Sequence, residues 1–304
     1  NFNKTIDINP GYSPAYLHRG NTYYEKRDYE KAVKDYEQTV KLDPENETAY
    51  IYLGLALSNT ENYSNSIRAF SQAIRVNPGS QLAFNYRGLV YTKMKRFQKA
   101  IESFNKLIEI KPDSPDAYNN RGVCYLQMKE FDKAIADYNK AVDLQPKNPQ
   151  IFYNRGNAFN YMKRYKDAIV NYDQAIRLND KFIQAYIARG NAKEALKLHR
   201  DAVMDFSKAI TINPKIIQGY LGRGLVFLNM KHYKKASEDF TLAIEINPGH
   251  AQSYLNRGIA FQNEGKYAYA VRDLNEYLKL HSKDDATAYK VRKWIRKMGA
   301  EPEA

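Results

Sequence analysis

The chain has 304 residues, with 47 Lys and Arg against 34 Asp and Glu and a formal net charge of +13. That length exceeds the usual size of one compact domain, and no apolar run approaches the ~20 residues of a membrane span. The single cysteine, Cys124, excludes an internal disulfide, and the positive charge favours an anionic partner such as nucleic acid, a lipid surface or an acidic protein. No secretory signal is visible, and the compartment and the oligomeric state stay open.

The first residues resemble a part of the chain that comes much later. Residues 1–10 read NFNKTIDINP, and residues 205–214 read DFSKAITINP. We interpret residues 1–12 as the end of a truncated upstream repeat. This interpretation predicts that the sequence is a fragment of a longer protein.

A glycine then recurs every 34 residues and defines the rest of the chain. The eight glycines are Gly20, Gly54, Gly88, Gly122, Gly156, Gly190, Gly224 and Gly258. We number the repeats 1 to 8 after these glycines and give positions within a repeat relative to its glycine. A fixed period of this size is typical of stacked supersecondary units.

Each repeat predicts two helices joined by a turn. Position −4 is aromatic and +12 is small in every repeat, +16 is aromatic in all but the last, and +24 is proline in six. Positions −4, 0 and +3 share one helix face, and +12, +16 and +19 share another, while proline ends the second helix. The small residues let the two helices approach, and the aromatic rings fill the space between them. One hairpin cannot bury both of its apolar faces, so the repeats must stack.

This pattern closely resembles the tetratricopeptide repeat over residues 13–282, eight tandem copies. The resemblance implies an all-α fold, a right-handed superhelical α-solenoid of 34-residue helix-turn-helix repeats. It also implies that the first helices line a concave groove used for protein–protein interaction. Residues 283–304 predict a C-terminal capping helix and a short tail, because repeat arrays need to cover their last apolar face. The apolar stripe of that helix comprises Ala288, Val291, Trp294, Ile295 and Met298.

Arginine precedes the glycine in seven repeats, and +15 is aspartate in five of those seven. The other two carry Ser103 and Asn171 at +15, which can also accept a hydrogen bond. Repeat 2 lacks both partners, with Leu53 and Ala69 in their places. A guanidinium beside a buried face needs an acceptor. We therefore predict a recurring structural bridge between the two helices of a repeat.

Positions −6, −3, +1, +4 and +5, with −2 beside them, form the stripe that should face the groove. From repeat 3 onward this stripe is nearly neutral and rich in asparagine, with apolar residues between the amides. An amide offers both a donor and an acceptor, which suits the backbone of an extended peptide. The predicted partner-binding residues are Asn85, Tyr86, Asn119, Asn120, Val123, Tyr153, Asn154, Asn157, Asn160, Tyr161, Asn191 and Asn256.

The stripe is similar to the asparagine ladder in the repeats of O-linked N-acetylglucosamine transferase. Asn120, Asn154 and Asn256 occupy the ladder slot at −2. The carboxylate clamp of chaperone-binding family members is expected to be absent, because its first lysine slot is filled by other residues. These residues are Leu17, Asn85, Asn119 and Tyr153. The alternative is that the asparagines only form a soluble groove lining.

Repeat 6 departs most from the pattern. Lys193 replaces an apolar residue at +3, and His199 replaces the aromatic of the turn. These changes predict either a softer joint in the stack or a specialised contact point.

No catalytic constellation, metal-binding motif or phosphate-binding glycine loop is visible. We therefore expect no enzyme activity in this chain, no metal and no cofactor. The sequence predicts a scaffold that binds an extended peptide segment of another protein. Two alternatives stay open: the substrate-selecting repeat region of a larger enzyme, or an array that docks RNA or an acidic surface through its basic outer face. Nucleic acid is the less favoured partner, because the cations are spread along the chain.

Overall fold

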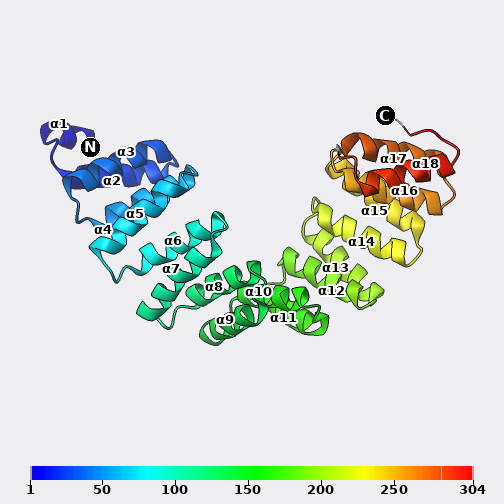
Figure 1. Ribbon diagram of the computed structural model, residues 1–304, viewed down its shortest axis with the longest axis horizontal. Coiled ribbons are helices and arrows are strands. Elements are labelled where there is room, and N and C mark those ends of the chain that lie inside the picture. Colours follow the sequence, from blue (N-terminus) through cyan, green and yellow to red (C-terminus); the bar gives the residue numbers. More distant parts are fainter. Residues whose placement is uncertain (1, 282, 303–304) are drawn as a thin grey trace. The chain divides into compact units, whose positions relative to one another are not determined.

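The structure is a computed structural model that describes residues 2–281 and 283–302. Within these ranges the chain forms helices joined by short connections, with no strand (Figure 1). The predicted end of the repeats at residue 282 lies outside the described residues, as do residues 1, 303 and 304. The chain divides into two compact units, residues 1–147 and 148–304, which we describe separately.

In each unit, every helix packs against the next one along the chain. The helices of the N-terminal unit are α1 (Phe2–Ile8), α2 (Ser13–Glu25), α3 (Tyr29–Leu42), α4 (Glu47–Asn59), α5 (Tyr63–Val76), α6 (Gln81–Lys93), α7 (Phe97–Ile110), α8 (Pro115–Gln127) and α9 (Phe131–Leu144). Those of the C-terminal unit are α10 (Pro149–Tyr161), α11 (Tyr165–Leu178), α12 (Ile183–Ala195), α13 (His199–Ile212), α14 (Ile217–Asn229), α15 (Tyr233–Ile246), α16 (Ala251–Asn263), α17 (Tyr267–Leu280) and α18 (Ala286–Lys297). The even-numbered helices α2 to α16 are the first helices of repeats, as the glycine period predicts.

The turn inside each repeat ends the first helix in the same way. The residue at +7 adopts a left-handed conformation, with φ near +60° in Lys197, for example. The amide of the next residue, Leu198, donates to the carbonyl of Lys193 at 2.9 Å, which is the closing bond of a Schellman motif. Apart from Gly265, these left-handed residues carry side chains: Arg27, Glu61, Lys95, Lys129, Lys163, Lys197 and Lys231.

The repeat glycine is required by a close approach of the ring at +16. A Cβ atom added to Gly54 would lie 2.6 Å from Phe70, whose ring is fully buried. Aromatic rings at +16 face the repeat glycines of repeats 1 to 7, and Leu274 faces Gly258 in repeat 8. The small residue at +12, which is Ser66 in repeat 2 and alanine in the other repeats, is buried as well. The predicted close packing of the two helices is therefore confirmed.

The predicted bridge between arginine at −1 and aspartate at +15 is confirmed. Arg121 donates from Nε and Nη2 to both carboxylate oxygens of Asp137, at 2.8 and 2.6 Å. This paired bond raises the pKa of Arg121. In repeats 3 and 5, Ser103 and Asn171 accept a bond from the arginine instead. The same two-bond geometry joins Arg19–Asp35, Arg189–Asp205, Arg223–Asp239 and Arg257–Asp273.

The same arginines also reach the preceding repeat, a contact that the sequence did not indicate. Arg121 donates from Nη1 to Asn105 at 2.7 Å, and Arg189 donates to Asp173 at 2.6 Å. These acceptors stand at +17 of the repeat before. Asn3 in α1 accepts from Arg19 in the equivalent way, at 2.8 Å. The interpretation of residues 1–12 as the end of a truncated upstream repeat stays a prediction.

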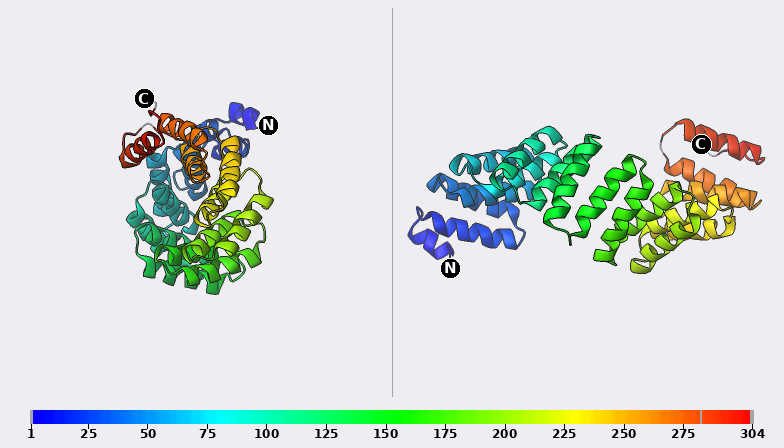
Figure 2. Two further views of the ribbon diagram at one scale, coloured as in Figure 1. Left: turned by 90° about the vertical axis from the view of Figure 1, so that its right-hand side faces the viewer. Right: turned by 90° about the horizontal axis from the view of Figure 1, so that it is seen from below.

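The C-terminal helix covers the end of the C-terminal unit. Figure 2 shows α18 beside α17, and Ala288, Val291 and Ile295 of its predicted apolar stripe are buried. Asp285 begins the helix, because its carboxylate accepts bonds from the amides of residues 287 and 288. The predicted capping role of this segment thus agrees with its packing.

In repeat 6, the side chain of Lys193, which replaces an apolar residue, has an anionic partner. The ammonium of Lys193 lies 2.8 Å from Asp205, which Arg189 also contacts. His199 lies 2.7 Å from Glu194. Both substituted side chains of this repeat therefore have polar partners, and the softer joint stays a prediction.

Candidate functional site

The site predicted from the sequence is the stripe of first-helix positions −6, −3, −2, +1, +4 and +5. In the N-terminal unit, the structure brings three of its asparagines together. Asn119 donates to Asn120 at 3.4 Å, and Asn120 donates to Asn85 at 3.5 Å. These are long hydrogen bonds and therefore weak. All three side chains are partly exposed, so their amides can exchange these contacts for contacts with a ligand.

The amides of the C-terminal unit have more binding partners inside the protein. Gln150 donates to Asn154 at 2.9 Å, and Gln252 donates to Asn256 at 3.0 Å. These pairs join the −6 and −2 slots of one helix. Asn256 is only 6% exposed, so its amide serves the helix more than a ligand.

Asn157 has a structural role that the sequence interpretation missed. It stands at +1 and accepts a hydrogen bond from the buried hydroxyl of Tyr172 at 2.8 Å. Asn21 accepts from Tyr36 in the same geometry in repeat 1. Asparagine at +1 together with tyrosine at +16 was the sequence signal for this pair.

The predicted tyrosines differ in their surroundings. The Tyr86 ring stacks on Phe70 with centroids 5.9 Å apart. Tyr153 lies against Phe182 at 5.1 Å, whereas Tyr161 is 63% exposed.

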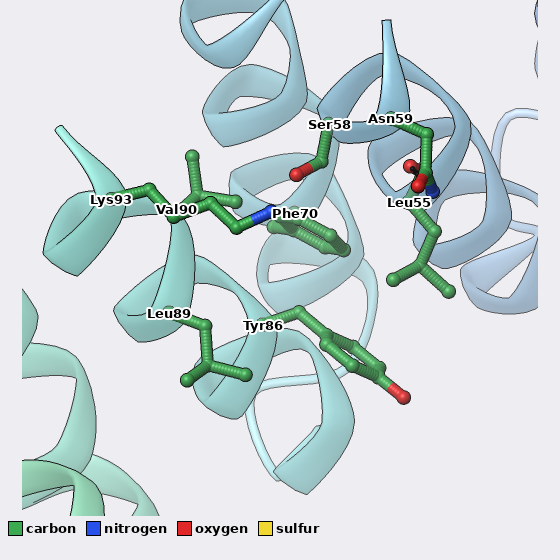
Figure 3. A pocket seen from close by; sticks show the side chains of 8 residues that line it. All are labelled: Leu55, Ser58, Asn59, Phe70, Tyr86, Leu89, Val90 and Lys93. Atoms are coloured by element: carbon green, nitrogen blue, oxygen red, sulfur yellow. Dashed lines mark hydrogen bonds between the residues drawn. The ribbon is translucent and has the colours of Figure 1, made fainter. Parts of the chain in front are cut away.

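A pocket of about 210 Å³ opens on the stripe of the N-terminal unit, between α4 and α6. Figure 3 shows the ring of Tyr86 and the side chain of Leu89 on its α6 side, and Leu55 on its α4 side. Of the residues that line this pocket, only Tyr86 was predicted to bind a partner. Leu55, Ser58 and Asn59 occupy stripe positions +1, +4 and +5 of repeat 2 and were missed, because the asparagine-rich stripe was traced from repeat 3 onward. The lining residues are Leu55, Ser58, Asn59, Phe70, Tyr86, Leu89, Val90 and Lys93.

A second pocket, of about 360 Å³, lies on the stripe of the C-terminal unit. It unites two predicted residues, Tyr153 and Asn191, with the amides of Gln184 and Gln218. Asn191 faces no tyrosine hydroxyl, because repeat 6 has Phe206 at +16. Its exposed amide points to ligand binding more directly than that of Asn157. Asn160 and Asn256 are not among the residues that line this pocket.

The described residues contain no group of three or more His, Cys, Asp or Glu side chains that could hold a metal ion. Cys124 is buried with its Sγ 3.3 Å from the hydroxyl of Thr92, and burial raises the pKa of the thiol. A thiol of this kind is a poor nucleophile. None of the described helices is long and apolar enough to cross a bilayer.

Paired helices with a repeating core and a polar stripe define a helical-repeat scaffold. Family models of the tetratricopeptide repeat match residues 115–148 and 149–182, and residues 48–80, 183–216 and 217–250. A further TPR-repeat model matches residues 20–60 and 88–129. The chain belongs to the tetratricopeptide repeat family.

Solved structures of related fold cover much of the chain. MamA is 25% identical over 56% of this chain and 92% of its own, with a TM-score of 0.51. YrrB, described as a TPR protein with an unusual peptide-binding site, is 22% identical over 64% of this chain and 99% of its own, with a TM-score of 0.53. A tetratricopeptide repeat protein from Parabacteroides merdae ATCC 43184 is 16% identical over 82% of this chain and 98% of its own, with a TM-score of 0.65. The search of curated proteins gave no match.

Proposed function

We propose that the first-helix stripe binds an extended segment of another protein. The observation that carries this proposal is the second pocket, where the exposed amide of Asn191 stands beside apolar Ile187. Such an amide can both donate to and accept from a peptide backbone. The apolar wall next to it offers a place for a side chain of the same peptide.

The pocket in the N-terminal unit also combines apolar and polar lining residues, and this supports peptide binding there as well. Its wall is apolar, and polar side chains stand at its edge. Binding sites in proteins are usually concave and apolar with a few polar groups that orient the ligand. The peptide-binding site of YrrB, a protein of similar fold, is a further reason to expect a peptide here.

The test uses a peptide selected on the full chain from a random dodecapeptide display library and then labelled with fluorescein. Asn85, Asn120 and Asn191 are replaced by alanine, singly and together. Each loss should weaken binding by roughly 0.5–1.5 kcal/mol where a hydrogen bond to the peptide is lost. Asn154 and Asn157 are left unchanged, because both have bonding partners within the protein.

Asn65→Ala is the matched control, since Asn65 is an exposed asparagine on the second helix α5. It should leave the affinity unchanged. If the three stripe variants bind the peptide as tightly as the parent chain while Asn65→Ala weakens it, the peptide-binding face lies elsewhere.

A further inference from the structure

The pocket between α4 and α6 has the dimensions of a site for one side chain. Its volume of about 210 Å³ lies below the roughly 300–1,000 Å³ of pockets that enclose a drug-sized ligand. Its floor is the buried ring of Phe70, and Leu55, Leu89 and Val90 stand around it. An apolar side chain placed here would cover carbon atoms on all these residues.

Lys93 is the one cation among the residues that line this pocket. Figure 3 shows its side chain extending from α6 across the pocket, with the amino group near Phe70 and on the side of Ser58. Among the ion pairs formed by the described residues, none includes Lys93. The described residues therefore provide no anionic partner for Lys93.

The neighbouring polar groups leave room for an anionic group of a ligand beside Lys93. The amide nitrogen of Asn59 already donates to the hydroxyl of Tyr24 and the carbonyl of Leu55. Ser58 is partly exposed and presents its hydroxyl to the pocket (Figure 3). A carboxylate could thus accept from the Lys93 ammonium and the Ser58 hydroxyl together.

We propose that this pocket recognises an apolar side chain followed by an acidic residue in the bound segment. The apolar side chain fills the space above Phe70, and the adjacent carboxylate pairs with Lys93. The inference rests on the proposed peptide-binding function and adds a sequence preference to it. The pocket of the C-terminal unit is lined by amides without a cation, so it carries no such preference for acid.

A purely structural role for Lys93 would look different. Lysine stems often lie along apolar surface while the ammonium stays in water. In that case, removing the charge would affect acidic and neutral peptides alike. The experiment therefore compares peptides that differ only in charge or only in apolar size.

Three pools of fluorescein-labelled octapeptides serve as probes, with Leu-Asp, Leu-Asn or Ala-Asp at the centre and mixed Ser, Thr, Gly and Asn elsewhere. Binding to the full chain is followed by fluorescence anisotropy. The Leu-Asp pool should bind about two- to fivefold more tightly than the Leu-Asn pool, as expected for a partly exposed ion pair. The Ala-Asp pool should bind more weakly than Leu-Asp, because it leaves the pocket unfilled.

Lys93→Gln should bring the Leu-Asp affinity down to that of Leu-Asn and leave Leu-Asn unchanged. Lys99→Gln, which removes an exposed lysine from the second helix α7, should preserve the ratio between the two pools. Raising the salt concentration should shrink the ratio in the parent chain and in Lys99→Gln, but should have no such effect in Lys93→Gln. A ratio near one in the parent, or a ratio that survives Lys93→Gln, overturns the proposal.

Methyl spectra of the labelled chain separate this proposal from the broader one. If the peptides shift the methyl signals of Ile187 but not those of Leu89 and Val90, the result would support peptide binding by the stripe and refute the role of this pocket. Pools that shift no methyl group on the first helices would refute both.

Discussion

The residue at +1 decides whether the buried hydroxyl of a tyrosine at +16 has a hydrogen-bond partner. Tyr172 donates to Asn157 at +1 of its repeat. Tyr138 is equally buried, but Val123 stands at +1 of its repeat. No described residue lies within hydrogen-bonding distance of the Tyr138 hydroxyl. A buried polar group without a partner costs about 1–3 kcal/mol.

Tyr138→Phe and Tyr172→Phe should therefore change stability in opposite directions. The first removes an unsatisfied hydroxyl and should raise the free energy of unfolding by about 1 kcal/mol. The second removes a satisfied one and should lower it by about 0.5–1.5 kcal/mol. Urea unfolding followed by circular dichroism measures both. Equal losses in the two variants would show that the Tyr138 hydroxyl has a partner in solution.

The left-handed residues at +7 give a second test at this scale. A side chain in this conformation costs roughly 1–2 kcal/mol compared with the right-handed region, and glycine avoids most of that cost. Lys197→Gly should therefore raise the free energy of unfolding, measured by urea unfolding, by up to about 1 kcal/mol. Lys208→Gly, in the middle of helix α13, should lower it by about 1 kcal/mol. A loss of stability in both variants would contradict the backbone explanation.

Predictions from the sequence at single positions succeeded where a residue type repeats. Glycine, alanine and the +16 ring recur with the period, so their packing could be inferred. The role of Asn157 was missed, because asparagine at +1 occurs together with tyrosine at +16 only in repeats 1 and 5. Asn191 and Asn157 share the +1 slot, and only the ring at +16 shows which of them has an internal partner.

At the scale of helices, the arginine at −1 joins three elements. Arg121 in α8 contacts Asp137 in α9 and Asn105 in α7. Its side chain is 19% exposed and that of Asp137 is 7% exposed. The bridge thus links the two helices of one repeat and also links that repeat to the one before.

Asp137→Ala should destabilise the N-terminal unit by about 1.5–3 kcal/mol, the usual range for hydrogen bonds to charged groups. A larger loss is not expected, because Arg121 keeps Asn105 and some access to water. Repeat 2 suggests the compensating change, since it has Leu53 and Ala69 in these two places. Adding Arg121→Leu to Asp137→Ala should recover part of the lost stability. A double variant less stable than the single one would show that the arginine has further structural roles.

The pairing within a repeat could be predicted because both partners recur in phase. The link to the preceding repeat could not, because position +17 holds five different types of polar residue across the eight repeats. Its acceptors include Ser71, Asn105, Asp173, Ser207 and Thr241. What these residues share is a side-chain oxygen, and a search for a repeated residue type does not detect that.

For the molecule as a whole, the net charge of +13 comes from cations that are spread along the chain. Five of the arginines pair with an aspartate within the fold and are not available to phosphate groups. We therefore expect no submicromolar complex with a 20-nucleotide single-stranded RNA or a DNA duplex at about physiological ionic strength. Fluorescence anisotropy at several salt concentrations tests this. A tight complex whose affinity falls steeply with salt would instead indicate phosphate contacts by the unpaired lysines.

The residue pattern within the 34-residue period was enough to predict the helix pairs and their order, and the apolar stripe after the last repeat predicted a further helix. It was not enough to locate the pockets, because these depend on which side chains of neighbouring first helices leave space between them. The handedness of the superhelix stays a prediction.

The fit between neighbouring repeats limits how they can be reordered. In repeat 7, position −2 is Gly222, and a Cβ atom there would lie 2.3 Å from the Phe206 ring of repeat 6. At the same position, repeats 2 and 3 carry tyrosines that stack on the preceding ring. The residue at −2 of each repeat therefore fits the ring of the repeat before it, although all repeats have the same pair of helices. An array shuffled by exchanging repeats 3 and 7 would set a tyrosine against Phe206, whose ring lies too close for a Cβ atom at this position and would have to move. The copies are therefore periodic but not freely interchangeable.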